Sequence, residues 1–216
     1  MLVLSVVIGS QVHGLATPLS DVDRRGVFVV PTRDFWRFEK PPTSRGGARP
    51  EELDREVEHF CALALKANPS VLEVLVSPRV EVRTGIGAEL RVLLPAFLSQ
   101  RAAESYRRAT AAHLARIQSR REATGGTKWK QVMHVVRLLL VCRDLVRSGE
   151  LSIDMTPYRA RLPAVRSGEV GWSEALAWAD DLRASIASAR SPLPAEPDRR
   201  AVEEWLVSVR ERGLAA

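Results

Sequence analysis

Apolar and polar positions in the first part of the chain follow the pattern of short strands separated by turns. Residues 2–8 form an almost continuous apolar run that ends at Gly9 and Ser10. A run of this length, rich in valine, leucine and isoleucine, is typical of a buried strand that enters a turn. Residues 15–20 are loop-like, and the alternation over residues 21–30 predicts a second strand.

The spacing of apolar residues changes after a breaker-rich segment, residues 41–50, which we expect to be a surface loop. From about residue 53 to residue 68 the apolar positions recur at helical intervals. Ser70 is the expected cap of a short helix that continues to Leu75. Residues 80–83 are predicted to form a brief extended segment.

Beyond residue 85 the pattern is helical throughout. Apolar positions recur at three- and four-residue intervals, and breaks rich in glycine, serine and proline separate the segments. These segments lie near residues 86–98, 104–121, 128–147, 172–190 and 198–211. The chain is therefore predicted to be an α/β (α+β) protein, with a small sheet-containing domain at residues 1–85 and a helical domain at residues 86–216.

Composition narrows the class of protein. The hydrophobic fraction of 45% is that of a globular chain, and no apolar run approaches the roughly 20 residues that a membrane span requires. The two cysteines, Cys61 and Cys142, lie in apolar segments, which argues against a disulfide framework and against a zinc site. We therefore expect a soluble, cytoplasmic protein without a membrane partner.

Positive charge is concentrated in the third quarter of the chain. The formal net charge is +6, and residues 101–150 carry 11 basic and 4 acidic residues. Such a segment suits a polyphosphate, a nucleotide or RNA. Arginines on solvated helix faces are the alternative explanation of the same composition.

Asp21 and Asp23 are the most informative pair of residues in the sequence. Side chains alternate along a strand, so carboxylates two residues apart point to the same face. Two neighbouring negative charges are costly unless a cation lies between them, and Mg²⁺ bound by carboxylates and nucleotide phosphates meets that need. The Gly9–Ser10 turn supplies backbone N–H groups and a hydroxyl that can approach phosphate oxygens.

The combination of Gly9–Ser10 with Asp21-x-Asp23 resembles the Gly-Ser…Asp-x-Asp motif of the DNA polymerase beta nucleotidyltransferase superfamily. Within that superfamily, the chain resembles a bacterial group of nucleotidyltransferases of the RNA-repair type. The blocks that carry this resemblance occur in family order at residues 9–26, 59–75, 133–139 and 191–194. The resemblance implies a small mixed-sheet nucleotidyltransferase domain followed by a helical domain.

The resemblance also implies an activity, the transfer of a nucleoside monophosphate from a nucleoside triphosphate to an acceptor hydroxyl with release of pyrophosphate. Two Mg²⁺ ions, with Mn²⁺ as the alternative metal, are then expected to be bound by three carboxylates. Asp21 and Asp23 match the first two positions. The third acidic position of the family falls at Glu51, with Glu52 and Asp54 as competing candidates.

Gly9 and Ser10 are the expected phosphate contacts on the sheet side, and a second group of nucleotide-binding candidates lies on a helix. Lys130, His134 and Arg137 are spaced so that they share one helix face. If this face meets the cleft, Lys130 acts as a point charge and Arg137 as a bidentate clamp for the triphosphate. The alternative is a solvated or locally paired helix face.

Two functions are compatible with the sequence. The first is an active nucleotidyltransferase, with RNA as the preferred acceptor because the helical half is basic. The second is a catalytically silent nucleotide-sensing or antitoxin-like partner-binding module, which is motivated by the competing candidates for the third carboxylate. His13, between the two parts of the motif, is interpreted as a structural residue, with a phosphate contact as the alternative.

Overall fold

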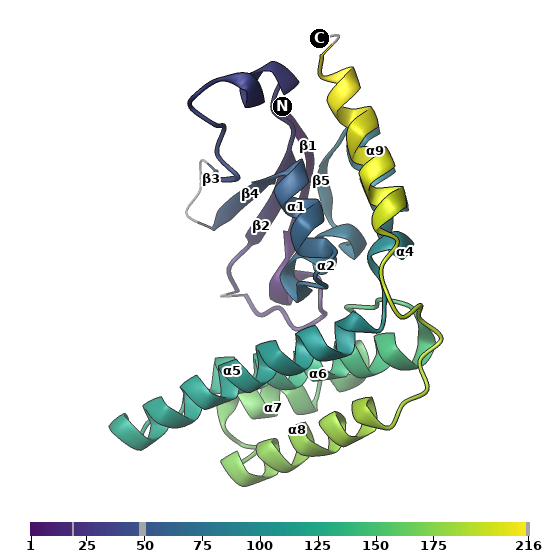
Figure 1. Cartoon of the computed structure of the whole chain (residues 1–216). Helices are drawn as coiled ribbons and strands as arrows, with labels where there is room; N and C mark the ends of the chain where they lie inside the picture. Colours follow the sequence, from purple (N-terminus) through teal and green to yellow (C-terminus); the bar gives the residue numbers. More distant parts are fainter. Residues whose placement is uncertain (19, 48–50, 215–216) are drawn as a thin grey trace.

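The computed structural model describes residues 1–18, 20–47 and 51–214, and Figure 1 shows how they are arranged. A five-stranded mixed sheet with the helices packed on it forms one half, and a group of longer helices forms the other. The predicted α/β class, with a small mixed sheet followed by helices, is confirmed.

The sheet has the strand order β3-β4-β2-β1-β5. Its strands are β1 (Leu2–Ile8), β2 (Asp23–Phe28), β3 (Ser44–Gly46), β4 (Glu52–Glu56) and β5 (Val80–Arg83). Neighbouring strands run antiparallel except β2 and β4, which run parallel. β1 has a strand on each side and is almost entirely buried, as its apolar run predicts.

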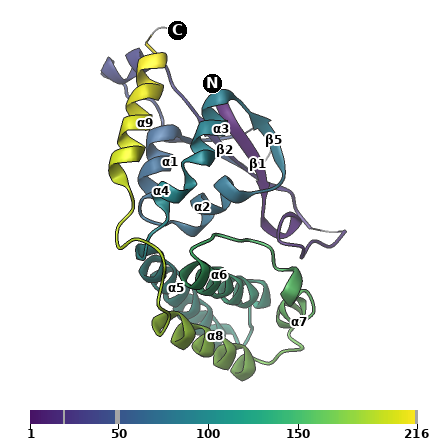
Figure 2. The same cartoon turned by 90° about the vertical axis from the view of Figure 1, so that its right-hand side faces the viewer.

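Short helices pack on the sheet, and the last helix of the chain joins them (Figures 1 and 2). They are α1 (Val57–Ala64), α2 (Pro69–Val76), α3 (Gly85–Val92), α4 (Leu94–Phe97) and α9 (Arg199–Arg212). α2 and α3 contact β1, whereas α9 contacts α1 and α4. The C-terminal helix therefore packs on the sheet half, although it follows the helical half in sequence.

The helical half is built around α6. It comprises α5 (Arg101–Thr124), α6 (Trp129–Ser148), α7 (Arg161–Ser167) and α8 (Trp172–Ala187). α6 packs against the other three helices, and its residues 135–142 are buried without exception. A helix that is apolar on nearly all faces is typical of the centre of a core.

The structure corrects several element boundaries in the sheet half. The second strand covers Asp23–Phe28 rather than residues 21–30. Residues 52–56, where helical spacing predicts the start of a helix, form β4, because pairing with β2 and β3 outweighs the local apolar period. β3 lies inside the loop predicted at residues 41–50, of which residues 48–50 lie outside the described part.

Helix boundaries also differ from the prediction. Asn68 precedes α2 and Pro69 occupies its first turn, so Ser70 lies within the helix and does not cap it. The helix expected at residues 86–98 is divided into α3 and α4. α7 is missing from the prediction because seven residues are too few to show a clear period.

Polar contacts hold α9 to the sheet half. The Arg210 guanidinium donates to both carboxylate oxygens of Glu56, at 2.9 Å from Nη1 to Oε1 and 3.0 Å from Nη2 to Oε2. The Thr32 hydroxyl donates to the Arg210 carbonyl oxygen at 2.6 Å. The division into residues 1–85 and 86–216 stays a prediction, and these contacts cross it.

None of the helices in the described ranges is by itself long and apolar enough to cross a membrane. α1 and α2 reach the required length only when they are taken together, and they meet at an angle of 110°. Both helices contribute most of their apolar side chains to the core of the sheet half.

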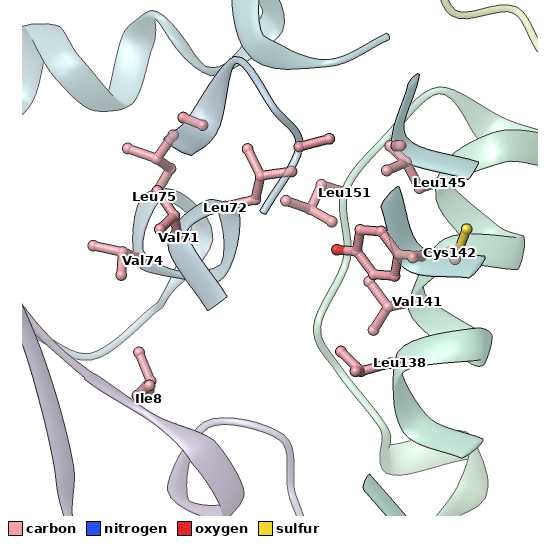
Figure 3. Close-up of a cluster of buried hydrophobic side chains, with 14 of the residues drawn as sticks. Ile8, Val71, Leu72, Val74, Leu75, Leu138, Val141, Cys142, Leu145 and Leu151 are labelled. Atoms are coloured by element: carbon pink, nitrogen blue, oxygen red, sulfur yellow. The ribbon is translucent and has the colours of Figure 1, made fainter. Parts of the chain in front are cut away.

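The two halves share one apolar core, to which α2 and α6 both contribute (Figure 3). Leu72 and Leu75 come from α2, and Leu138, Val141 and Leu145 come from α6. Each of these side chains is at most 4% exposed. The junction between the halves is therefore a continuous part of the core.

An ion pair is buried at this junction. Arg137 Nη1 of α6 lies 2.7 Å from Glu73 Oε1 of α2, and the two side chains are 6% and 4% exposed. Glu73 Oε2 also lies 3.6 Å from Nε2 of His13, in the loop after β1. Burial raises the pKa of Glu73, but the attraction of Arg137 and His13 outweighs burial, so the pKa is lowered.

We predict that Glu73→Ala lowers the free energy of unfolding by about 3–5 kcal/mol, because it leaves the Arg137 charge buried without its partner. Urea unfolding followed by circular dichroism measures this change. Glu104→Ala is the matched control, since it breaks an exposed pair with Arg107 on α5 and should change stability little. Equal losses in the two variants would contradict the structural role of the buried pair.

The same measurement has a pH dependence that isolates Glu73. Its pKa is lower in the folded chain than in the unfolded chain, so its contribution is complete above the ordinary value of 4.5. The contribution is lost as the pH falls through the folded value. The difference in stability between the natural protein and Glu73→Gln should therefore shrink on acidification, and a constant difference from neutral to acidic pH would count against the ion pair.

Candidate active site

A cleft of about 560 Å³ is lined by both halves of the structure. The end of β1, the turn after it, the start of β2 and α2 line one side, and α5, α6 and α7 line the other. The cleft brings together most of the residues expected at the site: Gly9, Ser10, Asp21, Asp23, Lys130, His134 and Arg137. Glu51 is the expected site residue that is not part of the lining.

The sheet register places Gly9 beside Asp23. Ile8 at the end of β1 pairs with Asp23 at the start of β2, and the Gly9–Ser10 turn follows directly. Gly9 has a φ of +77°, and a Cβ at this position would lie 3.0 Å from Asp23 Oδ2. Both the left-handed backbone and the close carboxylate therefore favour glycine.

Asp21 and Asp23 reach the cleft without charge partners. Asp21 precedes β2 and is exposed, whereas Asp23 begins the strand and is half-buried. Neither carboxylate accepts a hydrogen bond or forms an ion pair with any residue that the structure describes. Two carboxylates in this state fit a hard divalent cation such as Mg²⁺, which prefers oxygen ligands.

The register of β4 separates the candidates for a third carboxylate. β4 runs parallel to β2 with Glu52 beside Arg24, so Glu52 and Asp54 share the face of Arg24. Asp23 is one residue out of phase and points to the other face. Glu52 Oε1 lies 3.9 Å from Arg24 Nε, and this contact directs Glu52 away from the cleft.

Glu51 is in phase with Asp23 but is not among the residues that line the cleft. The Arg24 N–H donates to the Glu51 carbonyl at 3.1 Å, so the strand ladder continues to residue 51. Arg25 Nη1 donates to the same carbonyl at 2.9 Å. Glu51 is exposed, and the described part of the chain contains no group of three or more His, Cys, Asp or Glu side chains arranged to hold a metal.

α6 presents its candidate residues at increasing depth. Lys130 is exposed, His134 is half-buried, and Arg137 is only 5% exposed. Lys130 forms no ion pair within the described ranges. Arg137 donates to Glu73 Oε1 at 2.7 Å and to His134 Nδ1 at 3.3 Å, so its guanidinium is engaged inside the protein. This engagement does not match the bidentate phosphate clamp expected for Arg137.

His134 is neutral at physiological pH. Burial and then Arg137 lower the pKa of its imidazole to about 4, against the opposing effect of Glu73. Lys130 and Arg166, the latter from α7, line the same wall and have no ion-pair partner among the residues that the structure places. The accessible positive charge of this wall therefore comes from Lys130 and Arg166.

Sequence reasoning missed three ionisable residues of the cleft, Glu73, His113 and Arg166. Glu73 carried a usable signal, because a charged residue inside the apolar run of α2 is rarely buried without a partner. Arg166 lies on α7, a helix absent from the prediction. His113 lies on α5, whose period does not reveal which face meets the cleft.

His13 connects the turn to the helical half, in agreement with its interpretation as a structural residue. Its Nδ1 donates to the Ile153 carbonyl at 2.8 Å, and the Met155 N–H donates to the His13 carbonyl at 3.1 Å. Its buried Nε2 has no hydrogen-bond partner in the described ranges, since Glu73 at 3.6 Å is too distant for a hydrogen bond. The segment after α6 thus holds the loop that contains the Gly9–Ser10 turn.

Comparison with known proteins agrees with this geometry. A protein-family model, RlaP, described as the RNA repair pathway DNA polymerase beta family, matches residues 1–172, about four fifths of the chain. No curated protein and no solved structure matches. The matched range includes both walls of the cleft, and the expected resemblance to the DNA polymerase beta superfamily is confirmed. The chain belongs to the RNA repair pathway DNA polymerase beta family.

Proposed function

We propose that the protein transfers a nucleoside monophosphate from a nucleoside triphosphate to an acceptor hydroxyl and releases pyrophosphate. One observation supports this reaction most. Asp21 and Asp23, without partners in the described ranges, lie on one wall of the cleft, and the equally unpaired Lys130 and Arg166 lie on the other. Carboxylates for a divalent metal and cations for a triphosphate are thus available in one cleft.

The residues of the chain have separate roles in this proposal. Asp21 and Asp23 bind Mg²⁺, or Mn²⁺ in its place, with Glu51 as the candidate third ligand. The Gly9–Ser10 turn donates hydrogen bonds to phosphate oxygens, and Lys130 places a positive charge beside the triphosphate. Bound metal, two ions in this proposal, supplies activation of the acceptor oxygen and neutralises charge on the leaving group.

RNA is the acceptor in this proposal, and the reaction takes place in the cytoplasm. The matched family is described as part of an RNA repair pathway. α5 also carries exposed arginines, among them Arg116 and Arg120, that form no ion pair with described residues. Binding of an RNA acceptor should weaken steeply as salt rises, because phosphate contacts release counterions. Binding of a small-molecule acceptor should not.

One observation favours a second function. In the described part of the chain no third acidic side chain joins Asp21 and Asp23 in a group that could hold a metal. Glu51 lies outside the lining, and Glu73 pairs with Arg137. An incomplete set of metal ligands is compatible with nucleotide binding without turnover. That is the behaviour of a nucleotide-sensing or antitoxin-like partner-binding module. Tight nucleotide binding without pyrophosphate release, over all acceptors tested, would identify this second function.

We predict that Asp21→Asn and Asp23→Asn each lower turnover by roughly a thousandfold, because several kcal/mol of metal-based charge stabilisation are lost. The free energy of unfolding, measured in urea, should equal that of the natural protein or exceed it slightly, since repulsion between the two carboxylates is relieved. The assay combines Mg²⁺, each of the four α-labelled nucleoside triphosphates, and RNA, protein or small molecules as acceptor.

Asp180→Asn is the matched control for this assay, because Asp180 pairs with Arg183 on α8 and lies outside the cleft. Label that enters one acceptor pool, and is lost in Asp23→Asn but not in Asp180→Asn, supports the proposal and identifies the acceptor class. Full labelling by both cleft variants would refute the metal-site assignment.

The sheet register predicts which acidic residue assists Asp21 and Asp23. Glu51→Gln should lower turnover by roughly tenfold or more, because Glu51 is in phase with Asp23. Glu52→Gln and Asp54→Asn should leave turnover near the natural level, because their side chains lie on the opposite face. Steady-state rates with saturating Mg²⁺ measure the three variants, and a loss confined to Asp54→Asn would show that the register argument is wrong.

Lys130→Ala should weaken the binding of nucleoside triphosphate and of inorganic tripolyphosphate by a similar factor, roughly tenfold, because one charge-assisted phosphate contact is lost. The loss should diminish as salt screens the charge. Lys128→Ala provides a control at an exposed lysine outside the cleft. Calorimetric titration with Mg²⁺ measures both variants, and an unchanged affinity in Lys130→Ala would assign this helix face to solvent.

A further inference from the structure

Two histidines lie together on the helical wall of the cleft. His113 of α5 and His134 of α6 both line it, with ring centroids 5.6 Å apart and ring planes at 41°. α5 and α6 pack against each other, so the two rings lie on neighbouring helices of the helical half. The proposed reaction leaves the role of this His113–His134 pair unassigned.

The hydrogen bond from Arg137 determines the protonation of His134. A guanidinium only donates, so Nδ1 of His134 accepts from Arg137 and carries no proton. The ring is neutral, because burial and then Arg137 lower its pKa to about 4. His113 and His13 act in the same direction, whereas Glu73 opposes them. The remaining proton is therefore on Nε2, which has no partner in the described ranges and is available as a donor.

The His113 ring is also neutral at physiological pH. Burial and then Arg116 lower the pKa of its imidazole. A pair of neutral rings adds no positive charge for a triphosphate, in contrast to Lys130. Two imidazoles are also fewer ligands than a structural zinc site requires.

Apolar side chains also line the cleft that contains the pair. Ile8, Leu15 and Met133 line the same cleft, and each is at most 9% exposed. Neutral rings, apolar contacts and one N–H donor suit a flat heteroaromatic ligand with polar edges. We propose that the His113–His134 pair binds a nucleobase, by ring contact and by a hydrogen bond from His134 Nε2–H.

This inference rests on the proposed function and divides the cleft into two parts. Phosphates bind at the Gly9–Ser10 turn and Lys130, and a base binds at the His113–His134 pair. The base belongs either to the incoming nucleoside triphosphate or to the terminal nucleotide of an RNA acceptor. Both sources present the same chemistry, and the experiment separates them.

The test compares ligands with and without a base. Titrations in Mg²⁺ give the Kd for the four nucleoside triphosphates, for inorganic tripolyphosphate, and for a short RNA that ends in either a nucleotide or an abasic ribose. His113→Ala is expected to weaken the binding of ligands that carry the recognised base, with an increase in Kd of about tenfold. Tripolyphosphate and the abasic RNA are expected to bind as they do to the natural protein.

Three further variants separate ring contact from other effects. His113→Phe keeps an aromatic ring and is expected to recover most of the lost affinity. His134→Phe keeps the ring but removes the donor, so it is expected to change the order of preference among the four bases. His59→Ala on α1, outside the cleft, is the control for a histidine lost elsewhere.

The outcomes distinguish this inference from the proposed function. A loss confined to nucleoside triphosphates assigns the base to the incoming nucleotide, and a loss confined to RNA with a terminal base assigns it to the acceptor. Equal losses for tripolyphosphate and nucleotides, or no loss for any ligand, overturn the inference and leave the proposed function intact. A natural protein that binds neither nucleotide nor tripolyphosphate overturns both.

Discussion

The geometry of the cleft depends on one ionised carboxylate in the core, that of Glu73. A carboxylate removed from water requires compensation by charge and hydrogen bonds. Arg137 of α6 supplies the direct partner at 2.7 Å, and His13 approaches the second carboxylate oxygen from the loop after β1. These three groups come from distant parts of the sequence, so their charges balance only when the two halves are packed together. The packing that buries this ion pair therefore also brings the two walls of the cleft together.

Both halves supply charged side chains to the cleft. The sheet half supplies Asp21 and Asp23, with Arg25 on the same strand as Asp23, and the helical half supplies Lys130 and Arg166. His134, on the helical wall, is neutral, because burial and the positive charge of Arg137 disfavour a second cation there. A complex of divalent metal and polyphosphate has exposed charges of both signs. Packing of the helical half adds Lys130 and Arg166 to the cavity that contains Asp21 and Asp23, so the proposed reaction uses side chains of both halves.

Strand register decides which acidic side chains lie on the same face of the sheet as Asp23. The pairing of Ile8 with Asp23 brings the Gly9–Ser10 turn close to the Asp23 carboxylate. Glycine suits position 9 because it adopts the φ of +77° without strain and has no Cβ to crowd that carboxylate. The parallel pairing of β4 then places Glu52 and Asp54 on the opposite face. A shift of one residue would exchange these faces, because side chains alternate along a strand. The amino-acid composition of residues 51–54 does not show which of these acidic side chains lies on which face.

The sequence by itself determined the fold class, β1, the long helices, the family motif, and the shared helix face of Lys130 and Arg137. These are local signals, since apolar periodicity and motif spacing act within short stretches of chain. Tertiary structure alone decided that residues 52–56 form a strand, that Arg166 enters the cleft, and that Arg137 binds Glu73. The physical reason is that a helical period shows which residues share a face but not what that face meets. Strand pairing and the burial of charge depend on partners far away in the chain.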